Sequence, residues 1–84
     1  MLAATQNTTL ARVEEAIRSV FADDTITVAR DTTAADVPGW DSLMHVTLLV
    51  CLERTFQVRF SSAQVASLAN VGEIVSLIDT LRTH

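Results

Sequence analysis

Ser42 is the side chain of this sequence whose neighbours point most clearly to chemistry. Pro38 and Gly39 come shortly before it, Asp41 directly before it, and a long apolar stretch directly after it. Pro and Gly favour a turn, and Asp is among the preferred residues at a helix N-cap. Ser42 then falls in a first helical turn, where unpaired backbone N–H groups and the positive end of the helix dipole lie. A phosphate attached to this hydroxyl would be favourably placed.

His45 stands one turn after Ser42 and raises a second possibility, a serine nucleophile activated by a histidine base. The sequence offers this pair neither an orienting carboxylate at a suitable spacing nor an oxyanion-hole element. We keep a small hydrolase built on Ser42 and His45 as an alternative, which generic esters and the His45→Ala variant would test. The ordinary expectation is a solvated or partner-facing His45.

Other chemistries lack the residues that they need. Cys51 is the single cysteine, which excludes a disulfide within the chain, suits a reducing compartment and indicates a small buried apolar side chain. With His45 and His84 far apart, no zinc-type ligand cluster can form. The net charge of −4 and the scattered arginines argue against nucleic-acid binding and favour basic protein partners.

The ends and apolar stretches of the chain suit neither export nor a membrane. The N-terminus lacks the basic start and the apolar run of a signal peptide. No stretch approaches the roughly 20 uninterrupted apolar residues of a membrane span. We therefore expect a cytoplasmic protein that is a monomer and has no membrane partner.

The 84 residues are enough for one domain, 1–84, with a core over about residues 8–83. A domain of this size buries only about 60–65 % of the surface of its unfolded chain, so it needs a dense apolar core. The composition supplies one, because 49 % of the residues are hydrophobic.

Helical periodicity in four segments predicts an all-α fold, a bundle of three longer helices and one short helix. The segments cover about residues 10–21, 42–55, 61–68 and 71–83. The expected N-caps are Thr8 or Thr9 for the first, Asp41 for the second, Ser61 or Ser62 for the short third, and Asn70 with Glu73 in a capping-box variant for the fourth. The second segment is apolar around most of its circumference and should be the most buried helix; its apolar residues include Leu43, Val46, Leu48, Leu49, Val50, Leu52 and Phe56.

Two connections are unusual. Residues 23–41 form a long loop between the first and second helices, where about two to eight residues would be usual, and such loops are normally functional or disordered. Its apolar residues Ile26, Val28, Val37 and Trp40 predict that it packs over the helices. Residues 56–60 alternate apolar and polar side chains, and we expect an extended connection there because a strand would have no partner.

Three segments resemble the acyl and peptidyl carrier protein family. They are Gly39-Trp40-Asp41-Ser42-Leu43, Leu52-Glu53-Arg54-Thr55-Phe56-Gln57-Val58 and Ala69-Asn70-Val71-Gly72-Glu73-Ile74-Val75, in this order. The resemblance spans about residues 8–83 and implies a carrier that is not an enzyme. Ser42 matches the serine that accepts 4′-phosphopantetheine from coenzyme A, transferred by a separate phosphopantetheinyl transferase that uses Mg²⁺. The thiol of the arm then holds acyl groups as thioesters, so the domain supplies only positioning.

The resemblance also implies roles for the residues around Ser42. Asp41 matches an aspartate that helps to organise the Mg²⁺ of the transferase complex, although it could equally be an N-cap alone. Leu43 matches an apolar contact presented to partner enzymes, which are the transferase, an acyl-loading ligase or acyltransferase, and downstream synthase enzymes. The further candidates for partner contact are Trp40, Met44, His45 and Thr47. Of these, Trp40 has a second interpretation as an anchor of the loop, and Met44 as a buried residue.

The sequence departs from the family at the start of the second helix. Carriers of bacterial fatty-acid synthesis usually have acidic residues soon after the serine, whereas this chain has Met44, His45 and Thr47 there. The run Trp40 to Leu43 followed by His45 is more similar to carriers of polyketide or nonribosomal peptide pathways. We expect a discrete natural-product carrier, or a domain excised from a megasynthase. The alternatives are a carrier of fatty-acid synthesis and a helical interaction module without the arm.

Overall fold

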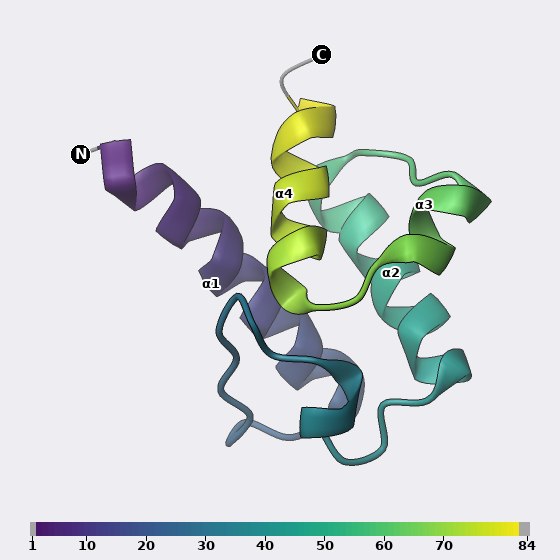
Figure 1. The fold of residues 1–84 in the computed structure, drawn as a ribbon. Helices are drawn as coiled ribbons and strands as arrows, with labels where there is room; N and C mark the ends of the chain where they lie inside the picture. Colours follow the sequence, from purple (N-terminus) through teal and green to yellow (C-terminus); the bar gives the residue numbers. More distant parts are fainter. Residues whose placement is uncertain (1, 83–84) are drawn as a thin grey trace.

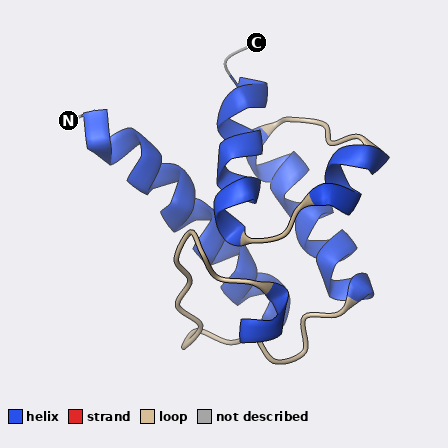
Figure 2. Cartoon of the chain, in the orientation of Figure 1, coloured by secondary structure: helices blue, strands red, loops and turns tan. Residues whose placement is uncertain are grey.

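The computed structural model describes residues 2–82, and it describes side chains from residue 9 onward. The helices are α1 (Leu2–Phe21), α2 (Ser42–Phe56), α3 (Ser62–Ser67) and α4 (Val71–Arg82), and a short 3₁₀ turn, η1 (Ala34–Asp36), lies in the long loop (Figures 1 and 2). No strand occurs within residues 2–82, and residues 57–61 connect α2 to α3. The predicted extended connection over residues 56–60 is only partly right, because Phe56 still belongs to α2 and Gln57 ends the helix in a left-handed conformation. The predicted all-α fold of three longer helices and one short helix is confirmed. Thr83 and His84 lie outside the described residues.

The predicted start of α1 is wrong. The helix begins at Leu2, so Thr8 and Thr9 lie inside it and neither is its N-cap. The segment before Thr8 contains no Gly or Pro, and its Leu and Ala residues favour a helix, so nothing stops the helix there. Thr9 instead faces inward, where its hydroxyl donates a hydrogen bond to Asp79 Oδ1 of α4 at 2.9 Å.

The buried face of α4 is more extensive than that of α2, contrary to the prediction. Five of the 12 residues of α4 are buried, against four of the 15 in α2. Leu48, Leu49, Leu52 and Phe56 form the buried face of α2 and pack with residues of α1 and α4, among them Val13, Ile17, Ile74 and Ile78. Leu43, Val46 and Val50 are exposed instead. The reason is the length of α3, which has only six residues and cannot cover the outer side of α2.

The long loop 23–41 packs against the bundle, as predicted. Val28 and Val37 are buried, and Ile26 and Trp40 lie half-buried, packed against the core. Because of this packing, the last residues of the loop, which lead into α2, lie close to the other helices.

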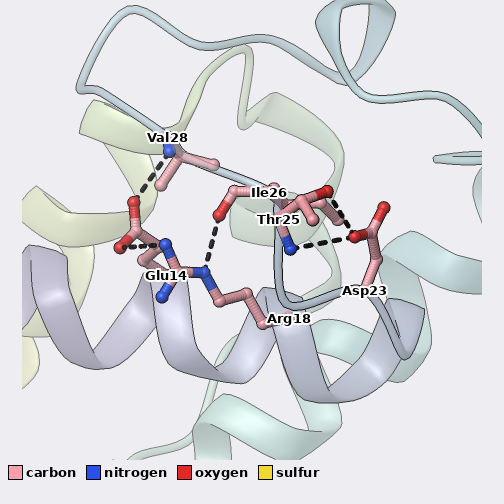
Figure 3. A network of polar contacts seen from close by, with 6 residues as sticks. All are labelled: Glu14, Arg18, Asp23, Thr25, Ile26 and Val28. Carbon is pink, nitrogen blue, oxygen red and sulfur yellow. Dashed lines mark hydrogen bonds and ion pairs between the residues drawn. The ribbon is translucent and has the colours of Figure 1, made fainter.

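A polar network fastens the first part of this loop to α1 (Figure 3). Glu14 Oε2 accepts a hydrogen bond from the backbone N–H of Val28 at 2.9 Å, and Arg18 Nε donates one to the carbonyl of Ile26 at 2.7 Å. Glu14 and Arg18 also form an ion pair at 3.2 Å. At the loop's start, hydrogen bonds from the hydroxyl and the N–H of residue 25 to the carboxylate of Asp23 lower the pKa of that carboxyl.

The middle of the loop meets the N-terminus of α4. The N–H of Val71 donates to the carbonyl of Thr32 at 2.8 Å, and the N–H of Gly72 donates to the carbonyl of Arg30 at 2.6 Å. Loop carbonyls therefore satisfy helix N–H groups that would otherwise lack partners. A Cβ on Gly72 would lie 2.7 Å from the carbonyl oxygen of Arg30, so only glycine permits this approach.

We expect Gly72→Ala to destabilise the domain by about 1–3 kcal/mol. Alanine improves helix propensity by about 1 kcal/mol, but the clash falls on backbone, so the loop must move and the Gly72–Arg30 hydrogen bond is lost. Urea unfolding followed by circular dichroism measures the change. Ser76→Ala, on the same helix as Gly72, is the matched control. It removes only an exposed hydrogen bond that Arg30 donates to the Ser76 hydroxyl and should cost less than about 0.5 kcal/mol. Equal stability of Gly72→Ala and the natural chain would contradict the close packing described here.

Candidate functional site

Ser42 is the first residue of α2 and is exposed. A turn directs the chain into the helix: the N–H of Trp40 donates to the carbonyl of Val37 at 3.2 Å, and Gly39 between them has a φ of +86°. A type II turn requires a positive φ at its third residue, which Gly39 supplies, and often has proline at its second, where Pro38 stands. The predicted turn is confirmed, and it presents the Ser42 hydroxyl at the end of the bundle.

Asp41 is the N-cap of α2, as predicted. Its Oδ1 accepts a hydrogen bond from the N–H of Met44 at 2.9 Å, and its backbone is extended. The carboxylate remains exposed to solvent, so a cation brought by another protein could reach it. The predicted cap residues of α3 and α4 also hold: Ser61 Oγ accepts from the N–H of Gln64, and Asn70 Oδ1 from the N–H of Glu73.

From Leu43 to Val50, the outer face of α2 is largely apolar and carries no Asp, Glu, Lys or Arg. Leu43 is 72 % exposed, Val46 53 % and Val50 46 %. Thr47 is exposed beside them, its hydroxyl donating to the carbonyl of Leu43 at 2.9 Å, and Met44 is half-buried. We call Leu43, Val46, Thr47 and Val50 the apolar face of α2.

The only acidic residue of α2 comes one turn after Val50 and lines a hollow together with Val46 and Val50. Glu53 lies toward the other end of the helix, where its Oε2 accepts the N–H of Phe60 at 2.9 Å. The first two turns after Ser42 therefore offer neighbouring proteins apolar contact in place of ionic contact.

Trp40 and His45 are half-buried and hydrogen-bonded to each other. The indole N–H of Trp40 donates to Nδ1 of His45 at 3.2 Å, and Nε2 of His45 lies 3.4 Å from the carbonyl oxygen of Val65 in α3. Trp40 also packs against Phe21 of α1, with 5.8 Å between ring centroids. The expectation that Trp40 anchors the loop is thus supported. His45 was expected to be solvated or partner-facing, but the structure engages both of its ring nitrogens within the domain, which removes the base required by the hydrolase hypothesis.

A shallow, mostly apolar cleft of about 450 Å³ opens beside Ser42, between α2 and α3. Its lining residues are Ala34, Trp40, Asp41, Ser42, His45, Val46, Val65, Ala66 and Leu68. A second hollow of about 340 Å³ shares Val46, Val65 and Ala66 with it and reaches Phe60. Apolar surface therefore continues from the serine along the junction of the two helices.

The described residues offer neither a metal-binding cluster nor a membrane-spanning helix. Among residues 2–82, no three or more His, Cys, Asp and Glu side chains gather where they could hold a metal ion. The described helices include none with the length and apolar character needed to span a membrane. Cys51 is half-buried against the core and unpaired by any disulfide.

Comparison with known proteins gives consistent matches. The family described as "Phosphopantetheine attachment site" matches residues 11–78. The acyl carrier protein of Exiguobacterium sibiricum is 32 % identical over 76 residues, which cover 90 % of this chain and 96 % of that protein. The solution structure of a holo acyl carrier protein from Geobacter metallireducens superposes with a TM-score of 0.84 at 37 % identity, covering 89 % of this chain and 86 % of that one.

The matched region contains the turn, the capped start of α2 and the helices that hold them, so sequence and fold agree. An exposed serine at the start of a helix suits a covalently bound phosphodiester, which the first-turn N–H groups can stabilise. The chain belongs to the phosphopantetheine-binding acyl carrier protein family, whose members are non-catalytic carriers.

Proposed function

We propose that Ser42 carries the 4′-phosphopantetheine arm and that the chain delivers acyl or aminoacyl thioesters to separate enzymes of polyketide or nonribosomal peptide biosynthesis. The main observation in support of attachment at Ser42 is that this residue is exposed at the first position of α2. The carrier works in the cytoplasm as a monomer.

The residues around Ser42 each have a part in holding and loading the arm. The positive end of α2 stabilises the phosphodiester, because the dipole and the first-turn N–H groups favour an anion there. The exposed carboxylate of Asp41 contributes to the Mg²⁺ site that forms only with the transferase bound. When attached, the arm supplies the thiol that forms the thioester.

The apolar face of α2 is the docking surface for the transferase and the acyl-handling enzymes. Leu43 lies next to Ser42 and is the most exposed large apolar side chain of the described residues. A partner that covers it removes apolar surface from water, which is worth roughly 25 cal/mol per Å². Trp40 and Met44 flank this contact.

The lack of acidic residues on the apolar face supports a natural-product pathway over fatty-acid synthesis. Enzymes that recognise carriers through basic patches gain little from Leu43, Met44 and Thr47, since electrostatic complementarity mainly raises the rate of association. The enzymes that use this carrier should instead present an apolar socket.

A change of partner tests this assignment. The natural chain, loaded with the arm, should be a poor substrate for a malonyltransferase of bacterial fatty-acid synthesis. Met44→Asp combined with Thr47→Glu should raise the kcat/KM of that malonyltransferase for the carrier by about tenfold. The added carboxylates would attract the basic patch of the enzyme and speed association. Met44→Asn with Thr47→Gln is the matched uncharged control. A natural chain that already reacts as fast as the acidic variant would contradict the pathway assignment.

A further inference from the structure

His45 links three parts of the molecule at the Ser42 end of α2. Its Nδ1 accepts from the indole of Trp40, in the loop, and its Nε2 faces the carbonyl oxygen of Val65, in α3. An indole N–H can only donate and a carbonyl can only accept. The two partners together therefore fit the tautomer of His45 that carries its proton on Nε2.

The positions of Trp40 and His45 in the helix explain what this link does. Asp41 is the N-cap, so Trp40 stands just before the cap and His45 is the fourth residue of the helix. Contact between these two positions fixes the direction in which a chain enters a helix, usually through apolar side chains. Here a hydrogen bond is added to the ring contact, whose centroids lie 6.0 Å apart. The residues enclosed by the link are those that orient the Ser42 hydroxyl.

The contact with Val65 adds a second constraint. α3 has only six residues and none of them is fully buried, so few contacts hold it in place. The His45–Val65 contact ties it to the first turn of α2, across the cleft that opens beside Ser42. One side chain thus couples the start of α2 to the wall of the cleft.

We propose that His45 is a positioning residue for the loading of Ser42, which acts through Trp40 and Val65; this inference rests on the proposed function. Without the hydrogen bonds of His45, the first turn of α2 and the whole of α3 vary in position. Only a fraction of the molecules then presents Ser42 in the orientation that the transferase requires. A binding-competent fraction below one raises the apparent KM in proportion and leaves kcat unchanged.

The link itself is tested by NMR. The chain has one tryptophan, so a ¹⁵N-labelled sample gives a single indole N–H signal. His45→Phe keeps an aromatic ring without either hydrogen bond, and its indole proton should exchange with water about tenfold faster. His45→Gln should restore slow exchange, because an amide can accept from Trp40 and donate to Val65 through one group. Exchange in the natural chain as fast as in His45→Phe would overturn the proposal.

Loading kinetics test the consequence for Ser42. With coenzyme A, Mg²⁺ and a broad-specificity phosphopantetheinyl transferase, His45→Phe should raise the KM for the carrier by at least about three- to tenfold at unchanged kcat, which is the effect that losing one ordinary hydrogen bond would have. His45→Gln should return KM to the natural value.

Trp40→Phe provides a second route if His45→Phe does not fold, because it removes the indole donor and keeps a ring. The double variant Trp40→Phe with His45→Gln should have the same KM as Trp40→Phe alone. An unchanged KM in both ring variants, or a raised KM that glutamine fails to lower, would overturn the positioning role. Failure of the natural chain to be loaded at all would instead contradict the attachment at Ser42.

Discussion

Ser42→Ala is expected to abolish attachment of the arm completely and to leave the domain folded. The hydroxyl is the only group that the transferase can modify at this position, and alanine has none. Ser42 is exposed, so the change in stability should stay within about 0.5 kcal/mol. Intact-mass spectrometry after incubation with coenzyme A, Mg²⁺ and a transferase measures the attachment, and urea unfolding measures stability.

Ser62→Ala is the matched control for this experiment. Ser62 is also exposed and also occupies the first position of a helix, directly after the cap residue Ser61. Ser62→Ala should gain one phosphopantetheine per chain, as the natural protein does. Modification of Ser42→Ala, or an unmodified natural chain with several different transferases, would rule out Ser42 as the attachment site.

Leu48→Ala should lower the free energy of unfolding by about 2–5 kcal/mol. The substitution leaves a cavity in the core, and the surrounding helices cannot fully close it. Leu48 is completely buried on the inner face of α2. Small domains have only about 5–15 kcal/mol of total stability, so this variant should be partly unfolded at modest urea concentrations. Urea unfolding gives the difference directly.

Leu43→Ala makes the same chemical change on the same helix and serves as its counterpart. Leu43 is 72 % exposed, so its truncation should change stability by no more than about 0.5 kcal/mol. It should nevertheless lower kcat/KM for loading, since the proposed docking contact is lost. Similar stability losses for Leu43→Ala and Leu48→Ala would contradict the orientation of α2 in this structure.

Short-range sequence signals predicted the turn and the caps of α2, α3 and α4, although not the start of α1. Asp41, Ser61 and Asn70 each cap the helix that was expected, because the cap depends on a side chain and an N–H only three residues away. Pro38 and Gly39 likewise determine their turn locally. The position of Ser42 at the start of α2 follows from these two features, which is why the candidate site could be found without a structure.

The orientation of α2 could not be predicted in the same way. Its apolar residues occupy most of its circumference, so periodicity alone does not say which of them face the core. Leu48 and Leu52 are buried while Val46 and Val50 are exposed, and the difference depends on how little of the helix α3 covers. That is a property of the assembled bundle.

His45 illustrates a different limit. The spacing of Trp40 and His45 around the cap was a local signal that could have indicated their contact. The partner of the second ring nitrogen is the carbonyl of Val65, 20 residues away, and it is brought there only by the path of residues 57–61. No pattern in the sequence specifies that approach.

The place of Trp40 gives the domain a built-in optical probe. The chain contains one Trp and no Tyr, so its ultraviolet emission comes from a single half-buried indole that lines the cleft next to Ser42. Indole emission shifts in wavelength with the polarity of its surroundings. An arm folding into the cleft, or an enzyme covering it, therefore becomes visible in unlabelled protein, in real time and at low concentration.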